Sequence, residues 1–144
     1  LAVTETDMTI FFRQLSHAGN EDTTGNPLAP FMQAYYKPEE LTSEYRDAMG
    51  KWLRDYRQRL KNSTLDEEER REKMNRVNPK FVFRNYLAQQ AIDQAEQGDY
   101  AMIEELMSVL SRPYDEQTGK ERFCAPRPEW ARNRPGCSML SCSS

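Results

Sequence analysis

The sequence predicts an all-α fold, an irregular bundle of about five helices followed by an extended, proline-rich C-terminal tail. Apolar residues recur at spacings of three and four along much of the chain, which is the period of an amphipathic helix. No segment alternates apolar and polar residues over a length that would make a useful strand. Beyond residue 111 a long helix is excluded because proline recurs, at Pro113, Pro126, Pro128 and Pro135.

The first half of the chain contains the clearest helical patterns. Residues 4–17 carry one apolar stripe, and the polar turn at residues 19–26 ends it. An apolar patch within residues 28–36 predicts a short helix or a packed loop. The strongest pattern is a five-turn stripe, which comprises Leu41, Tyr45, Ala48, Met49, Trp52, Leu53, Tyr56 and Leu60. We expect the aromatic side chains of this stripe, Trp52 among them, to lie in the core.

A strongly charged helix is predicted next. Thr64 and Glu67 match a capping box, in which each side chain accepts a hydrogen bond from a backbone amide of the first turn. Four acidic residues each precede a basic one at a spacing of four: Asp66/Arg70, Glu67/Arg71, Glu69/Lys73 and Glu72/Arg76. Such a pair stabilises a helix by about 0.2–0.5 kcal/mol. Because apolar residues are scarce here, we expect an exposed helix that builds no core.

Two further helices, at residues 84–97 and 99–111, are predicted to form an antiparallel hairpin. Gly98 is a suitable residue to end the first helix, and Asp99 can cap the second. Because the joint between the helices is so short, their apolar faces should meet. We expect four side chains of these faces to be buried: Leu87, Ile92, Ile103 and Leu106.

Length and composition fit one helical domain at residues 1–111, with a tail at residues 112–144. Only 38% of the 144 residues are hydrophobic and 30% are charged, which favours a thin core or one completed by something outside this chain. The net charge is −3 with interspersed signs, and no apolar run could span a bilayer, so neither nucleic acid nor a membrane is an expected partner. Three cysteines, an odd number, argue against a secreted disulfide framework and favour the cytoplasm.

The start of the chain suggests an excised segment. The opening residues, LAVTETD, include no initiator methionine and lack the basic start of a signal peptide. We therefore expect the chain to be part of a larger protein.

The residues provide no complete set of catalytic groups. The six glycines are scattered, and none forms a phosphate-binding loop. His17, the only histidine, has no identifiable nucleophile as partner, and its predicted place at a helix C-terminus suits its charge alone. The carboxylates of residues 66–69 occupy consecutive helix positions and do not converge, so we read them as a solvated face. We expect no catalytic, cofactor-binding or metal-binding residue in this chain.

The C-terminal thiols are the exception. Cys137 and Cys142 lie five residues apart in the polar sequence GCSMLSCSS, where we expect both side chains to be accessible. Three interpretations remain open. The thiols are inert, or they take part in redox chemistry or a disulfide, as accessible thiolates do, or they contribute to a metal site with an incomplete ligand set.

Several stretches resemble one family. The segments NPKFVFRNYLAQQAIDQAEQGDY, VLSRPYDEQ, PEWA and the terminal SCSS strongly resemble the C-terminal region of the selenoprotein O family. The segment DMTIFFRQL and the pattern W-x-x-x-Y-x-x-R-L, which starts at Trp52, fit the same family. The resemblance covers nearly the whole chain. Three residues depart from the family pattern: Phe83 replaces an aliphatic residue, Arg127 interrupts a proline-rich segment, and Cys137 is an additional cysteine.

The resemblance implies that the parent protein is a protein adenylyltransferase with a kinase-like (pseudokinase) fold. Such proteins bind ATP in a flipped orientation and transfer AMP to Ser, Thr or Tyr hydroxyls of other proteins, using Mg²⁺ or Mn²⁺. Their nucleotide-binding and metal-binding residues lie in an upstream region, so this chain is expected to be non-catalytic. Its expected partners are the N-terminal kinase-like catalytic domain of the same chain and the protein substrates.

The resemblance also bears on the tail. Cys142 matches the position at which some family members carry selenocysteine, which implies a redox role for Cys142, with either Cys137 or a cysteine of the catalytic region as its partner. Two alternatives belong to other classes of function. The chain could be an independent helical module for protein interaction, or its tail could bind a metal through its thiols.

Overall fold

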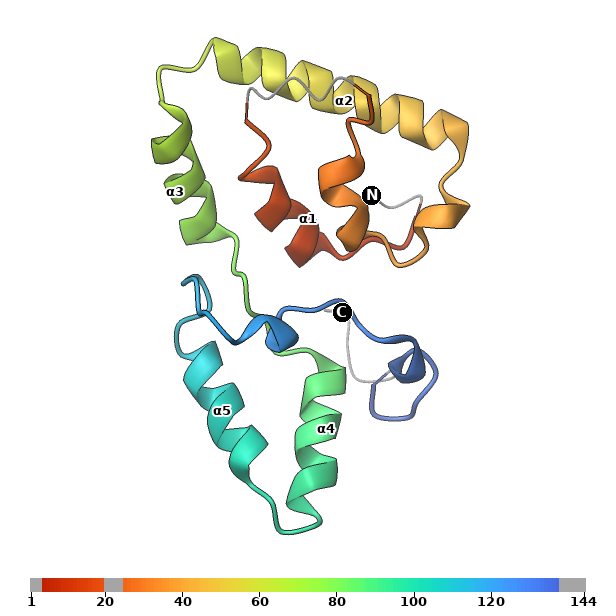
Figure 1. The fold of residues 1–144 in the computed structure, drawn as a ribbon, viewed down its shortest axis with the longest axis vertical. Helices are drawn as coiled ribbons and strands as arrows, with labels where there is room; N and C mark the ends of the chain where they lie inside the picture. The colour runs from red at the N-terminus through yellow and green to blue at the C-terminus, as the bar shows by residue number, and fades with distance from the viewer. Residues whose placement is uncertain (1–3, 20–24, 138–144) are drawn as a thin grey trace. The chain divides into compact units, whose positions relative to one another are not determined.

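The computed structural model describes residues 4–19 and 25–137 and confirms the all-α prediction for them. Five α-helices and four short 3₁₀ helices make up the regular structure of this part of the chain, together with one isolated β-bridge between Thr6 and Tyr35 (Figure 1). The chain divides into two compact units, unit 1 at residues 1–78 and unit 2 at residues 79–144. This division differs from the boundary after residue 111 that the sequence suggested.

Unit 1 contains the helices α1 (Met8–Leu15), α2 (Ser43–Lys61) and α3 (Glu67–Val77), with the 3₁₀ helices η1 (Ala29–Ala34) and η2 (Pro38–Glu40) between the first two. The first helix begins four residues later than predicted because the backbone before it pairs with another segment. The Asp7 amide donates to the carbonyl of Ala34, at 2.7 Å, and the Asp7 side chain then caps α1 by accepting from the amide of Ile10.

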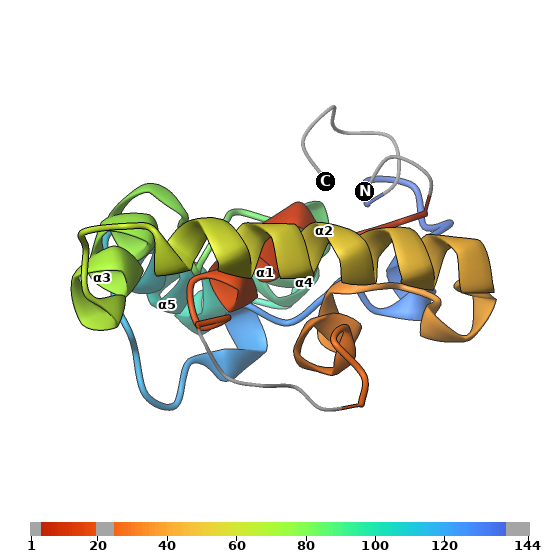
Figure 2. The same cartoon turned by 90° about the horizontal axis from the view of Figure 1, so that it is seen from above.

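The core of unit 1 forms where α1, η1 and α2 meet; α2 lies crosswise to the other two in Figure 1 and passes over α1 in Figure 2. The rings of Phe11 and Phe31 lie 5.0 Å apart at its centre, and Leu53 is completely buried beside them. Trp52 is 43% exposed, so the prediction that it lies in the core is wrong. Successive helical residues point about 100° apart, and Leu53 takes the inward direction, so Trp52 stacks on Tyr56 at the surface instead.

Helix α3 differs in two respects from the predicted charged helix. Its N-cap is Asp66 rather than Thr64, because the Asp66 carboxylate accepts from the amide of Glu69 at 2.8 Å. Arg70 is buried and is not paired with Asp66 as the sequence suggested. The Arg70 guanidinium donates to the carbonyl of Ser16 at 3.1 Å and to the Tyr56 hydroxyl at 3.3 Å. The helix therefore contributes a buried side chain to the unit, contrary to the expectation from its composition.

Unit 2 is built on the predicted hairpin of α4 (Asn85–Ala95) and α5 (Ala101–Leu110). Gly98 adopts a φ of +85°, the left-handed conformation that favours glycine, and ends the first helix as expected. Leu87 and Leu106 are buried, as predicted. Two other side chains expected in the core, Ile92 and Ile103, are exposed.

Residues 112–137 account for this difference because they pack on the hairpin rather than extending away from it. They include the 3₁₀ helices η3 (Glu121–Phe123) and η4 (Glu129–Ala131), and the side chains of Phe123 and Ala131 are buried in the core of unit 2. Gln117 ties this segment to α5, since its amide nitrogen donates to the carbonyl of Val109 at 3.0 Å. The segment covers one face of the hairpin and leaves the face with the two isoleucines uncovered within unit 2.

The buried guanidinium of α3 leads to a stability prediction. Replacing Arg70 with alanine removes its hydrogen bonds and leaves the buried carbonyl of Ser16 without this donor, so we expect a loss of about 1.5–3 kcal/mol in the free energy of unfolding. Arg71→Ala is the matched control, because Arg71 makes an exposed ion pair with Glu68 and should change stability by less than about 0.5 kcal/mol. Urea denaturation followed by circular dichroism measures both. Equal effects would show that Arg70 contributes no more than a surface pair.

Candidate functional sites

Cys137, one of the two thiols predicted to be accessible, is buried. Its side chain belongs to the core of unit 2, and the residue is only 3% exposed. Its backbone is also held in place, because the amide donates to the carbonyl of Arg134 at 3.1 Å. The expectation of an exposed Cys137 is therefore wrong, since residues 112–137 fold onto the hairpin. Cys142, the other predicted redox residue, lies outside the described residues.

Cys124 is the second cysteine within the described residues, and its thiol is free, as is that of Cys137. It is half-buried, and its thiol donates to the carbonyl of Glu121 at 3.2 Å. Burial raises the pKa of the Cys124 thiol, while the nearby charges of Lys80 and Arg84 act in the opposite direction. Because the thiolate is the reactive form, a raised pKa makes this cysteine less reactive at neutral pH.

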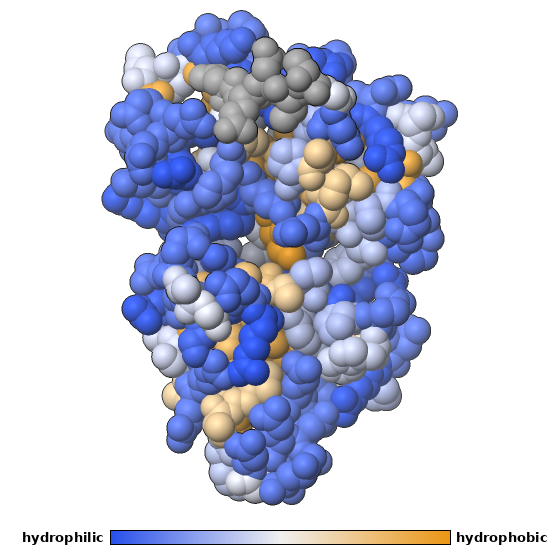
Figure 3. Space-filling model, in the orientation of Figure 1, coloured by the Kyte–Doolittle hydropathy of each residue, from blue (hydrophilic) through white to orange (hydrophobic). Residues whose placement is uncertain are grey.

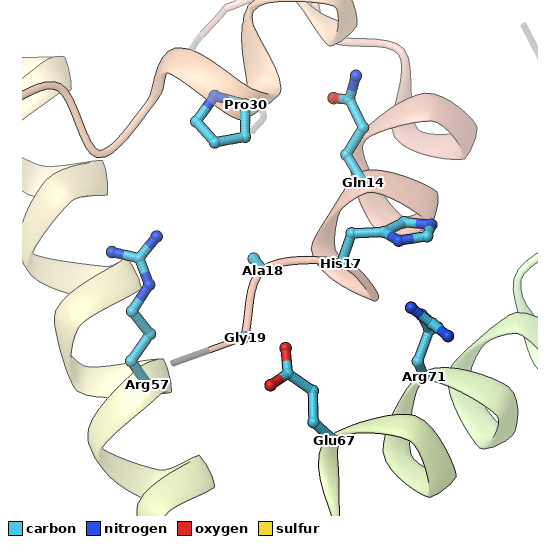
Figure 4. A pocket seen from close by; sticks show the side chains of 8 residues that line it. All are labelled: Gln14, His17, Ala18, Gly19, Pro30, Arg57, Glu67 and Arg71. Carbon is cyan, nitrogen blue, oxygen red and sulfur yellow. The ribbon is translucent and has the colours of Figure 1, made fainter. Parts of the chain in front are cut away.

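A polar pocket of about 510 Å³ lies in unit 1 (Figure 4). Its lining residues come from α1 and the residues after it, from η1, and from the facing sides of α2 and α3: Gln14, His17, Ala18, Gly19, Pro30, Arg57, Glu67 and Arg71. His17 lies after the end of α1, as the sequence predicted, and its imidazole points away from Arg57 (Figure 4). The described lining residues include no hydroxyl and no thiol.

The carboxylates at the start of α3 are used separately. Asp66 caps the helix, Glu68 pairs with Arg71 at 2.7 Å, and Glu69 pairs with Lys73 at 3.0 Å. The carboxylate of Glu67 instead lies against Gly19, where an added Cβ would overlap it. The four carboxylates therefore point to different partners. This agrees with the sequence analysis, which expected that they would not converge on one point. Within residues 4–19 and 25–137 no cluster of three or more histidine, cysteine, aspartate and glutamate side chains could hold a metal ion.

An apolar groove of about 420 Å³ lies along the α4–α5 hairpin, over which the space-filling view shows apolar surface bordered by hydrophilic residues (Figure 3). All of its lining residues are apolar: Phe83, Ala88, Ala91, Ile92, Ile103, Leu106, Met107 and Leu110. The sequence patterns missed the groove because Ile92 and Ile103 fit the stripe of a covered hairpin. Phe83, which departs from the family pattern, lines this groove.

The hairpin that carries the groove is acidic. Residues 85–110 contain no lysine, arginine or histidine and five acidic residues: Asp93, Glu96, Asp99, Glu104 and Glu105. Two of the five are paired within unit 2, Asp93 with Arg134 at 2.8 Å and Glu105 with Lys120 at 2.6 Å. The hydrogen bond from Lys120 lowers the pKa of Glu105. The other three carboxylates are exposed, so the hairpin itself, residues 85–110, presents acidic and no basic side chains to its surroundings.

No helix of the part of the chain that the structure describes is both long enough and apolar enough to cross a membrane.

Comparison with known proteins identifies similar chains. The family model described as protein adenylyltransferase SelO matches residues 1–111. A protein nucleotidyltransferase YdiU from Rhodopirellula baltica is 49% identical over 154 residues, which cover 100% of this chain and 28% of the relative. Proteins of the same name from Aromatoleum aromaticum and Methylobacillus flagellatus are 52% and 54% identical over 140 residues, covering 97% of this chain and 26% of each relative. The chain thus spans about a quarter of the length of the curated relatives it matches.

The surroundings of the two described thiols predict their reactivity. In the native chain we expect iodoacetamide to label Cys137 far more slowly than in urea, because its side chain is buried. Labelling of Cys124 should continue to accelerate above pH 8.5, about the pKa of an ordinary thiol, where labelling of such a thiol levels off, since the pKa of Cys124 is raised. Peptide mass spectrometry at timed intervals measures both rates. Native labelling of Cys137 as fast as in urea would contradict its place in the core.

Proposed function

Because this chain belongs to the SelO protein adenylyltransferase family, we propose that it is the helical C-terminal region of an enzyme that transfers AMP from ATP to Ser, Thr or Tyr hydroxyls of proteins. The observation that carries the proposal is the identity of about one half with proteins named as nucleotidyltransferases, sustained over 97–100% of the chain. The matched part is about a quarter of those relatives, so most of such an enzyme would lie outside residues 1–144.

The proposal places ATP and its Mg²⁺ or Mn²⁺ in another part of the enzyme. Mg²⁺ prefers oxygen ligands in octahedral geometry, supplied by carboxylates together with phosphate oxygens and water. The described carboxylates at the start of α3 do not fit this requirement, because each of the four meets a different partner. We therefore assign no step of AMP transfer to the described residues, and we propose that the chain is non-catalytic on its own.

The role proposed for the chain is that of a folded partner of the kinase-like catalytic domain. Each of the two units has its own buried core, with Phe11 and Phe31 in unit 1 and Phe81 and Phe123 in unit 2. The uncovered apolar groove on unit 2 supports the second candidate, a helical module that binds other proteins, because apolar surface of this kind marks interaction sites.

We propose that the protein acts in the cytoplasm.

The tail is proposed to act in redox regulation through Cys142. Burial of Cys137 makes it a poor partner for a disulfide, so we favour a cysteine elsewhere in the enzyme. Formation of the disulfide would pass two electrons and two protons from the two thiols to a disulfide oxidant such as oxidised glutathione, which leaves as two reduced glutathione molecules.

The catalytic part of the proposal is tested with two forms of the protein. The full-length polypeptide should transfer labelled AMP to a protein substrate in the presence of Mg²⁺ or Mn²⁺, and a metal chelator should abolish the transfer. The 144-residue chain should show neither transfer nor ATP binding in a calorimeter. Saturable binding of ATP at micromolar concentration by the short chain would contradict the assignment of the nucleotide site to another region.

The redox part is tested in the full-length polypeptide by titration with oxidised glutathione. We expect AMP transfer by the wild type to change on oxidation, and Cys142→Ser to remove that response. Cys137→Ala is the control: it keeps the buried position apolar and should retain the response. A Cys142→Ser variant with an unchanged redox response and an unchanged disulfide pattern would mean that the tail is inert.

A further inference from the structure

The groove on the α4–α5 hairpin has the chemistry of a binding site for an apolar protein surface. Its floor includes the buried side chains of Ala91 and Leu106. Phe83 and Met107 stand exposed along it, and Met107 is 69% exposed. None of the lining side chains can donate or accept a strong hydrogen bond, so a small polar ligand would lose its hydration and gain no partner. An apolar occupant would instead gain free energy by leaving water.

The charge around the groove indicates which apolar occupant fits. The exposed carboxylates of Glu96, Asp99 and Glu104 lie on the same hairpin, which carries no basic residue. An anionic membrane surface would be repelled by them. A second copy of the hairpin would bring like charges together, because a two-fold interface places the same surface on both sides. The complementary partner is apolar on one face and basic beside it.

Two antiparallel helices with an apolar groove along them accept a third helix in a recurring mode of recognition, in which the apolar face of an amphipathic helix enters the groove. We infer that the α4–α5 groove receives such a helix, with basic residues flanking its apolar face, from the part of the polypeptide that lies outside residues 1–144. This inference rests on the proposed function, because it requires the chain to be part of the longer enzyme.

The length of the relatives and the modest size of the groove both agree with an occupant from the same polypeptide. About three quarters of the relatives' length lies outside the matched part, so a long stretch of sequence is available to supply the helix. A tethered segment binds at an effective concentration of about millimolar, so a weak site suffices for stable docking. A groove of about 420 Å³ lined by two short helices is suited to such a contact.

Photocrosslinking in the full-length polypeptide identifies the occupant directly. p-Benzoylphenylalanine replaces Phe83, which lines the groove and is exposed, so the larger ring can reach whatever fills it. We expect a cross-linked product at the mass of the monomer, with the second peptide mapping outside residues 1–144. The matched control is the same replacement at Tyr114, an exposed aromatic residue of unit 2 that does not line the groove. It should give several-fold less of this product.

Three outcomes would overturn the inference. A product at twice the monomer mass would identify a second copy as the occupant. Cross-links confined to residues 1–144 would show that the groove is covered from within this chain. A yield at position 83 no greater than that at position 114 would show that nothing occupies it.

A second pair of variants tests the groove without a probe. Met107→Lys places a positive charge in the groove, and Val77→Lys places the same charge at a similarly exposed apolar residue, 72% exposed, outside it. In the full-length polypeptide, Met107→Lys should speed amide deuterium exchange in α4 and α5, and Val77→Lys should not. Neither should change exchange in the 144-residue chain. Equal exchange in both full-length variants would contradict occupation of the groove.

AMP transfer by the unmodified full-length polypeptide separates the two proposals. Transfer without cross-linking from position 83 would refute the groove inference and leave the proposed function intact. Absence of transfer would refute the proposed function, whatever the cross-links show.

Discussion

Two arginine side chains hold α1 and α3 together by a reciprocal exchange of hydrogen bonds, and the attachment of α3 to unit 1 depends on it. Arg13 of α1 donates to the carbonyls of Asn75 and Asn78 at the end of α3, at 3.1 and 3.0 Å. Arg70 of α3 donates in return to the carbonyl of Ser16 at the end of α1. The last carbonyls of a helix have no partner within it and carry partial negative charge, so a guanidinium both completes their hydrogen bonds and complements the helix dipole. Each helix thus supplies the cap that the other lacks.

This exchange explains how a chain with few apolar residues can hold a helix as polar as α3. Met74 packs on the core of unit 1, but the helix offers little else that is apolar. The aliphatic stem of Arg70 packs in the interior of the unit, as an apolar side chain would. Its guanidinium donates to a backbone carbonyl and to a hydroxyl oxygen. Unit 2 meets the same shortage differently, by folding a proline-rich segment with few helical turns over one face of its hairpin.

Local sequence predicted the elements well, and long-range packing explains most of what it missed. The long helix, the hairpin and its glycine turn followed from periodicity and capping preferences, which act between near neighbours. Periodicity does not show which part of a stripe is covered, because the cover comes from distant residues; hence Trp52 and Ile92 were wrongly placed in a core. Arg70 resembled a surface ion-pair partner because its acceptor, the carbonyl of Ser16, lies 54 residues earlier in the chain. The family was evident from its motifs, whereas the groove depends on the face that residues 112–137 leave open.

The base of the hairpin in unit 2 has a consequence for how this region can change in evolution. The amides of Lys80 and Phe81 both donate to the carbonyl of Pro113, at 2.8 and 3.0 Å, so the chain enters and leaves the hairpin at one point. Extra helical turns added on both sides of Gly98 would lengthen the hairpin without moving its base. A longer hairpin of this kind would accommodate a longer partner helix, while the base of the unit keeps its hydrogen bonds to Pro113.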